Sequence, residues 1–188
     1  MNDNDKYVLD TIKICVWSGF CDKDDVHEVI DDILEDDADE ALLRASVAIE
    51  FEKKATAEAS WPDETDCDRL DQVFDTLNSN GIIALHNAGV TMSDGLRDVG
   101  EELHQRNGTA ITGYCFYHGQ DVERAVAGDG LMLAFGDLND DNAAKVVVGN
   151  VIKDALEKGG FNTEWNGDSE SRIKIPSIDW KRRSPEFD

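Results

Sequence analysis

The front of the chain repeats apolar residues at helical spacing between runs of acidic residues. This pattern predicts three amphipathic helices, at about 7–18, 22–34 and 39–57. Gly19 can end the first helix, and Asp22 can cap the second. Pro62 then breaks the pattern, because proline lacks a backbone N–H and restricts the residue before it. We therefore expect a small helical domain at 1–60, followed by a second domain at 61–188.

Beyond this break, helical and strand-like segments alternate. Apolar residues at helical spacing predict helices at about 65–79, 93–106, 120–127 and 140–158. Short β-branched and aromatic runs predict strands at about 82–85, 111–118, 131–135, 161–165 and 172–175. We expect an α+β fold with a mainly antiparallel sheet of four to five strands. The two long helices, 93–106 and 140–158, are expected on one face, in a split β-α-β, ferredoxin-like outline. A small parallel sheet is the alternative, because the linker around 120–127 is near the minimum length for a parallel crossover.

Charge narrows the possible partners. The chain has 41 acidic and 18 basic residues, a formal net charge of −23, and its acidic residues are densest at 22–40. Such a field repels phosphate backbones and anionic membrane surfaces, which argues against direct nucleic-acid or membrane binding. The anionic face of the helix at 22–34 either docks a basic protein partner or only keeps the protein soluble, for example in a salty cytoplasm.

Targeting and cysteine patterns favour a cytoplasmic protein. The chain starts without the basic and apolar leader of an exported protein. Its longest apolar run, 131–135, is far shorter than the roughly 20 residues that span a bilayer. The four cysteines, Cys15, Cys21, Cys67 and Cys115, form no Cys-x-x-Cys pair. We expect them to be reduced and mostly to fill the interior, and we expect no metal and no cofactor.

Polar residues gather where the strand at 111–118 meets the short helix. His118 and Asp121 can form an acid/base pair there, because imidazole titrates near neutrality and a carboxylate fixes its tautomer. The structural alternative is that Asp121 only caps the helix. Glu123 is a further catalytic candidate, and Tyr117, Gln120 and Arg124 are binding candidates.

A second polar group opens the helix at 65–79. Cys67 is a candidate nucleophile near a helix N-terminus, but the carboxylates of Asp66 and Asp68 counteract a lowered thiol pKa. Asp66 and Asp68 remain binding candidates. No His-x-His spacing supports a metal site, and no glycine-rich phosphate loop is present. The sequence therefore favours a protein that docks a basic partner, with a small hydrolase or transferase around His118 and Asp121 as the alternative.

Six sequence blocks carry a family resemblance. They are WP at 61–62, TDCDRLD at 65–71, SDG at 93–95, FYHGQDVERA at 116–125, LMLAFG at 131–136 and DWKRR at 179–183. These blocks resemble those of a bacterial family classed as a domain of unknown function, and the resemblance covers most of the chain. It implies membership of the family but no activity, cofactor or catalytic residue.

Overall fold

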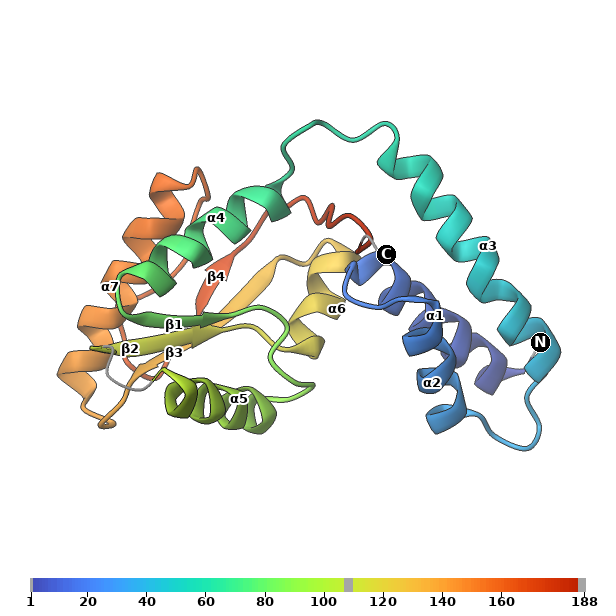
Figure 1. The fold of residues 1–188 in the computed structure, drawn as a ribbon, viewed down its shortest axis with the longest axis horizontal. Coiled ribbons are helices and arrows are strands. Elements are labelled where there is room, and N and C mark those ends of the chain that lie inside the picture. The colour runs from blue at the N-terminus through green and yellow to red at the C-terminus, as the bar shows by residue number, and fades with distance from the viewer. Residues whose placement is uncertain (1, 107–109, 186–188) are drawn as a thin grey trace. The chain divides into compact units, whose positions relative to one another are not determined.

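The computed structural model describes residues 2–106 and 110–185, which contain seven helices and four strands (Figure 1). The chain divides into two compact units. The first runs to Thr65 and includes the C-terminal segment from Lys181, and the second is Asp66–Trp180. No helix in the described ranges is long and apolar enough to cross a membrane. The expected domains at 1–60 and 61–188 remain a prediction.

The first unit is built from three helices, as predicted. These are α1 (Asp3–Ser18), α2 (Lys23–Ile33) and α3 (Glu40–Glu58). The side chains of Asn2, Asp22 and Asp39 each accept a backbone hydrogen bond at a helix start. Gly19 ends α1 in the left-handed conformation, with φ +77°. The core of this unit consists of Val8, Ile12, Val16, Val26, Ile30, Leu43 and Val47.

The C-terminal segment packs on these helices. Ser184 donates its backbone N–H to Glu58 Oε1 at 2.8 Å and accepts a hydrogen bond from Lys54 Nζ at 3.0 Å. Lys54 has no exposed surface, and its ammonium lies 3.4 Å from the Glu58 carboxylate. The Arg182 guanidinium lies 4.7 Å from the centre of the Phe20 ring. The segment is therefore held by partners from α3 and from the turn after α1.

The second unit is a four-stranded mixed sheet with helices on both faces (Figure 1). Its elements are α4 (Asp66–Ser79), β1 (Ile82–Leu85), α5 (Met92–Gln105), β2 (Gly113–Phe116), α6 (Gly119–Ala127), β3 (Leu131–Asp137), α7 (Asn142–Lys158) and β4 (Ile173–Ile175). The strand order is β1-β2-β3-β4; β1 and β2 are parallel, whereas β2 with β3 and β3 with β4 are antiparallel. The fold is α+β, as predicted.

Three finer predictions about the sheet are wrong. The sheet is mixed rather than mainly antiparallel, because α5 provides a crossover between β1 and β2. The two long helices lie on opposite faces: α7 packs against Gly113 of β2, and α5 packs against Phe116 of the same strand. The first half of the expected hairpin, at 161–165, forms only an isolated bridge between Glu164 and Lys174 of β4, so the described sheet has four strands, the lower of the two expected numbers. The alternative of a parallel crossover around 120–127 also fails, because β2 and β3 are antiparallel.

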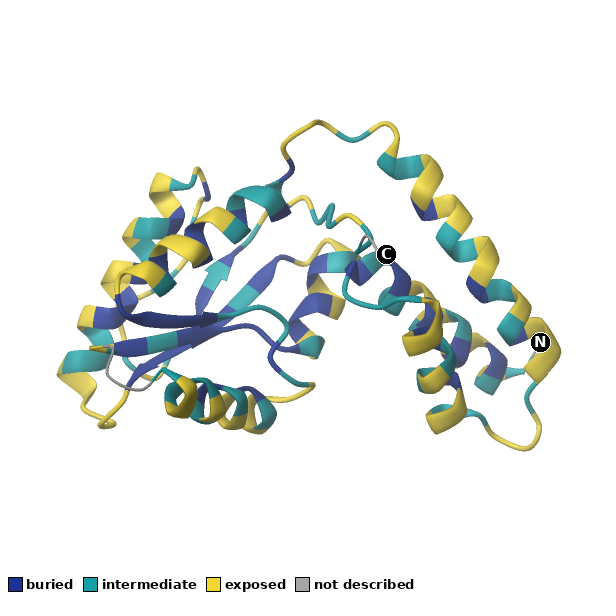
Figure 2. Cartoon of the chain, viewed as in Figure 1, coloured by how far each residue is buried: buried dark blue, intermediate teal, exposed yellow. Residues whose placement is uncertain are grey.

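Burial follows from this layering (Figure 2). Ile82, Ile83 and Ala84 are all buried although they follow one another along β1, so both faces of this strand are covered. The free edge of β1 is covered by Asn78 at the end of α4. The amide of Asn78 donates to Ala84 O and accepts from Ala84 N–H, both at 3.0 Å.

Candidate functional site

The candidate site lies beyond the carboxyl ends of β1 and β2. Because these two strands are parallel, the residues that follow them, His86 and Tyr117, emerge at the same edge of the sheet. In open α/β sheets this edge is where ligands usually bind. The mixed sheet therefore brings together side chains that are far apart in the sequence.

Three polar side chains lie in contact with one another at this edge. The Tyr117 hydroxyl lies 2.8 Å from His86 Nδ1, and His86 Nε2 lies 3.3 Å from Asp71 Oδ1 on α4. Phe74 stacks on the imidazole with ring centres 4.3 Å apart, which fixes its plane. We call this the Tyr117–His86–Asp71 array. The phenol is fully buried, whereas the side chains of His86 and Asp71 are 27% and 40% exposed.

The array has the elements of a proton relay. The imidazole can take the phenolic proton at Nδ1 while its Nε2–H stays bonded to the carboxylate, which stabilises the imidazolium. Trp180 makes an edge contact with the Tyr117 ring, with centres 5.9 Å apart. The partly exposed imidazole and carboxylate are the parts of this array that a ligand can contact.

His118 and Asp121 do meet, as the sequence suggested, but as a buried helix cap. Asp121 accepts the His118 backbone N–H at 3.2 Å, and its carboxylate lies 3.3 Å from His118 Nε2. The same carboxylate is bonded to Arg172, which also donates to Met132 O at 2.8 Å. His118 is 4% exposed and Asp121 is fully buried. The pair thus ties the start of α6 to β3 and to the segment before β4.

Burial sets the protonation of His118. It lowers the imidazole pKa by disfavouring the charged form, and the nearby Asp121 carboxylate opposes this only in part. The neutral imidazole is therefore favoured at neutral pH. Three atoms in this group have no hydrogen-bond partner among the described residues, namely His118 Nδ1, Asp121 Oδ1 and Arg172 Nε.

The remaining predicted residues of α6 lie on its outer side. Gln120, Glu123 and Arg124 are exposed, and Arg124 lies 3.6 Å from Asp121 Oδ1. They surround the cap of α6 without entering it. They therefore stay candidates for surface contacts, and their predicted roles remain predictions.

The predicted residues of α4 have structural partners. Cys67 is buried together with Leu70 on the inner side of the helix. The Asp66 carboxylate accepts from Arg69 at 2.5 Å and from the Asp179 backbone N–H at 2.9 Å. Asp68 is half-buried near the start of α4. The predicted site is thus divided between two elements: Asp66, Cys67 and Asp68 belong to α4, while the His118–Asp121 pair caps α6.

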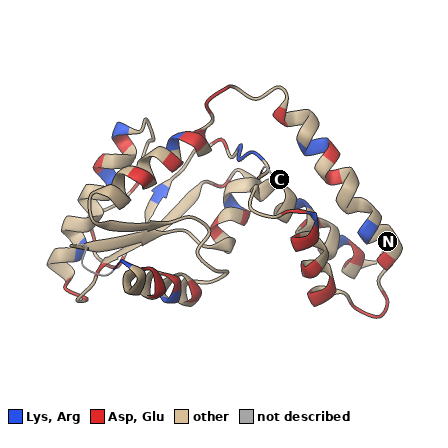
Figure 3. Cartoon of the chain, in the orientation of Figure 1, with Lys and Arg blue, Asp and Glu red and all other residues tan. Residues whose placement is uncertain are grey.

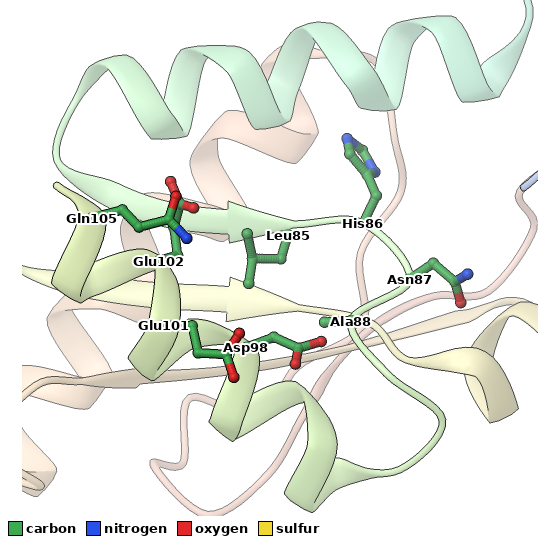
Figure 4. A pocket seen from close by; sticks show the side chains of 8 residues that line it. All are labelled: Leu85, His86, Asn87, Ala88, Asp98, Glu101, Glu102 and Gln105. Carbon is green, nitrogen blue, oxygen red and sulfur yellow. The ribbon is translucent and has the colours of Figure 1, made fainter.

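A pocket of about 230 Å³ lies between the end of β1 and α5 (Figure 4). It is lined by Leu85, His86, Asn87, Ala88, Asp98, Glu101, Glu102 and Gln105. Figure 4 shows the His86 ring turned toward α4, away from the acidic side chains of α5. Those acids have basic neighbours, since Arg97 lies 3.6 Å from Asp98 and Arg106 lies 2.6 Å from Glu102. In the described part of the chain, no group of three or more His, Cys, Asp or Glu residues is arranged to hold a metal ion.

Sequence reasoning missed His86 and Asp71. His86 directly follows the apolar run at 82–85, and a polar residue at the end of a buried strand is a signal for a site at the sheet edge. The sequence gives no such signal for Asp71, because only its contact with the His86 imidazole marks this α4 residue as part of a site.

Acidic residues follow one another closely along α2 and the segment after it, in the first unit (Figure 3). Between residues 24 and 40 the sequence has ten acidic residues and no lysine or arginine, and all ten are exposed. We call the part of this run on and after α2 the α2 acidic surface. It consists of Asp24, Asp25, Glu28, Asp31, Asp32, Glu35, Asp36 and Asp37. Arg44 of α3 pairs with Asp31.

These features define an α+β protein with an attached acidic helical unit. The chain belongs to the family described as Domain of unknown function (DUF6891), whose model matches residues 1–184. The resemblance to a family of unknown function is thereby confirmed. Comparison with curated proteins found no match. Comparison with solved structures found none either.

Proposed function

We propose that this protein is an acidic cytosolic binding protein that docks a basic protein partner on the α2 acidic surface. The observation that carries the proposal is the set of ten exposed carboxylates between residues 24 and 40, with no lysine or arginine among them. The same negative field disfavours nucleic acids and anionic lipid surfaces as partners.

The spacing of these carboxylates explains why a basic segment would be attracted. Side chains three or four positions apart on α2 are neighbours, well within the Debye length of about 8 Å at physiological salt. Their fields therefore add, and among the described residues Arg44 pairs with Asp31 of this surface. A lysine- or arginine-rich segment that lies along α2 would relieve this repulsion and would associate faster at low salt.

The test is a titration of the protein with a short lysine-rich peptide, followed by fluorescence anisotropy. One variant neutralises four acids of the α2 acidic surface that are not helix caps: Asp24→Asn, Glu28→Gln, Asp32→Asn and Asp36→Asn. The control variant removes the same charge from exposed acids of the second unit: Asp75→Asn, Glu123→Gln, Asp129→Asn and Asp154→Asn.

We expect the first variant to bind the peptide about tenfold more weakly, about 1.4 kcal/mol, and the control to change affinity much less. Equal weakening in both variants would mean that net charge alone attracts the peptide. In that case the acidity is a general property of the surface, and the docking proposal is wrong.

A second candidate function is a small hydrolase or transferase, and one observation favours it. The Tyr117–His86–Asp71 array places an oriented imidazole between a phenol and a carboxylate at the edge where α/β proteins usually bind ligands. The His118–Asp121 pair supports this function less, because burial and capping account for its contacts.

The enzymatic candidate is tested with chromogenic esters and phosphate monoesters of p-nitrophenol. Activity that is lost in His86→Ala and kept in His104→Ala would support it, because His104 is exposed and bonds only to its own helix at Gly100 O in the described chain. Activity that survives His86→Ala, or no activity toward either substrate class, would argue against a site at the array.

A further inference from the structure

Two of the four cysteines come together at the end of α1. Cys15 lies in the last turn of this helix, and Cys21 lies just before Asp22, the N-cap of α2. Gly19, with φ +77°, reverses the chain between them. Ser18 fixes the turn, because its hydroxyl donates to Cys15 O at 2.6 Å and accepts from Phe20 N–H at 3.1 Å. As a result the side chains of Cys15 and Cys21 are in hydrogen-bonding contact.

Accessibility separates this pair from the other two cysteines. Cys15 and Cys21 pack against the rim of the helical core and keep part of their surface exposed. Cys67 and Cys115 are buried, with 1% and 0% of their surface exposed. Burial also raises the pKa of the Cys115 thiol far above its usual range, which keeps it protonated. A small oxidant in solution therefore meets the pair in the first unit before it reaches either buried thiol.

We propose that Cys15 and Cys21 form a reversible intramolecular disulfide when the protein meets hydrogen peroxide. In the first step the Cys21 sulfur attacks one peroxide oxygen: an S–O bond forms, the O–O bond breaks, and the hydroxide that leaves takes up the thiol proton as water. In the second step the Cys15 sulfur attacks Cys21: the S–S bond forms, the S–O bond breaks, and a second water leaves with the Cys15 proton. Both sulfurs are oxidised and the peroxide is reduced to two waters.

The surroundings of Cys21 suit it to the attacking role. The hydrogen bond with Cys15 lowers the pKa of the Cys21 thiol, and a hydrogen bond with Ser18 adds to this. Burial and the carboxylates of Asp25 and Asp22 act in the opposite direction, but the net shift is downward. Since the thiolate is the nucleophile, the lowered pKa favours Cys21 as the attacking thiol, and Cys15 is in place to resolve the sulfenic acid.

Trypsin makes the bond simple to detect. Cleavage after Lys13 and after Lys23 releases the single peptide 14–23, which contains both Cys15 and Cys21 and neither of the other cysteines. An internal disulfide lowers the mass of this peptide by two hydrogen atoms, about 2 Da, relative to the reduced form.

The experiment treats the reduced protein with stoichiometric hydrogen peroxide at neutral pH, then blocks the remaining thiols and maps the peptides. We expect two of the four thiols to disappear, peptide 14–23 to lose about 2 Da, and dithiothreitol to restore both thiols. Cys67→Ala, which removes a buried thiol, should give the same peptide product. Cys21→Ser should prevent it, with circular dichroism confirming that the variant is folded.

Several results would overturn the inference. One is oxidation of Cys67 or Cys115 at the same rate as the pair. Others are a peptide 14–23 that gains oxygen without losing two hydrogens, a disulfide between two molecules, and no thiol loss beyond that of free cysteine at the same peroxide concentration.

Discussion

Removing the Asn78 side chain should destabilise the sheet more than its position near a helix end suggests. Its amide forms two hydrogen bonds to the backbone of Ala84, a residue that is 4% exposed, and so takes the place of a neighbouring strand at the edge of β1. In Asn78→Ala both the N–H and the C=O of Ala84 lose their partner.

The magnitude follows from the two lost bonds. A buried backbone group without a partner costs about 1–3 kcal/mol, so two such groups cost roughly 2–4 kcal/mol, allowing for some access of water at the edge. Asn78→Asp should fall between wild type and Asn78→Ala, because a carboxylate can accept from Ala84 N–H but has no donor for Ala84 O. The exposed edge should also favour pairing between molecules.

Urea unfolding followed by circular dichroism measures the loss of unfolding free energy, and size-exclusion chromatography detects any association between molecules. Asn80→Ala is the matched control, because the Asn80 amide is exposed and donates only to the helix carbonyl of Thr76 among the described residues. We expect this control to change stability by less than about 0.5 kcal/mol. If Asn78→Ala matches Asn80→Ala, the amide does not protect the edge and the reasoning is wrong.

Three further predictions concern the second unit. Because the pKa of His118 is lowered by folding, the unfolded chain binds a proton that the folded chain excludes. The free energy of unfolding should therefore fall as the pH drops below about 6.5. His118→Asn should flatten this dependence, as measured by a pH series of urea titrations. Asp121→Ala should cost about 2–4 kcal/mol in urea unfolding, because it removes the partner of a half-buried arginine, whereas Glu123→Ala on the exposed side of the same helix should be nearly neutral. Gly113→Ala should lower the melting temperature, because the added methyl would lie 2.6 Å from α7. Gly100 lies in the middle of α5 with open space beside it, so Gly100→Ala should raise the melting temperature by stabilising that helix by about 0.5–1 kcal/mol.

The helices could be predicted from the sequence because their signals are local. Apolar spacing located the three helices of the first unit, and Asp22 acts as the expected cap of α2. The layering of the sheet depends instead on which face each helix covers, and that is decided by contacts between distant segments. One local signal was present: the uninterrupted apolar run at 82–85 is typical of a strand covered on both faces, as the structure shows for β1.

The site was predicted less completely than the fold. The contact between His118 and Asp121 follows from their spacing across a helix start, and capping accounts for it. The partnership of His86 with Tyr117 could not be read from the sequence, because 31 positions separate them and only the parallel pairing of β1 and β2 places them at one edge. The acidic run at 24–40 was visible at once, since exposure of a charged helix face requires no tertiary contact.

The most direct test of the docking proposal is to locate the bound peptide. Nuclear magnetic resonance spectra of the ¹⁵N-labelled protein, recorded during titration with the lysine-rich peptide, report which backbone amides respond. The account predicts that the largest shifts fall between residues 24 and 37 and fade as salt is added. Shifts of similar size at the exposed acids of α5 and α7 would contradict it, because they would show that the peptide follows overall charge and has no preferred surface.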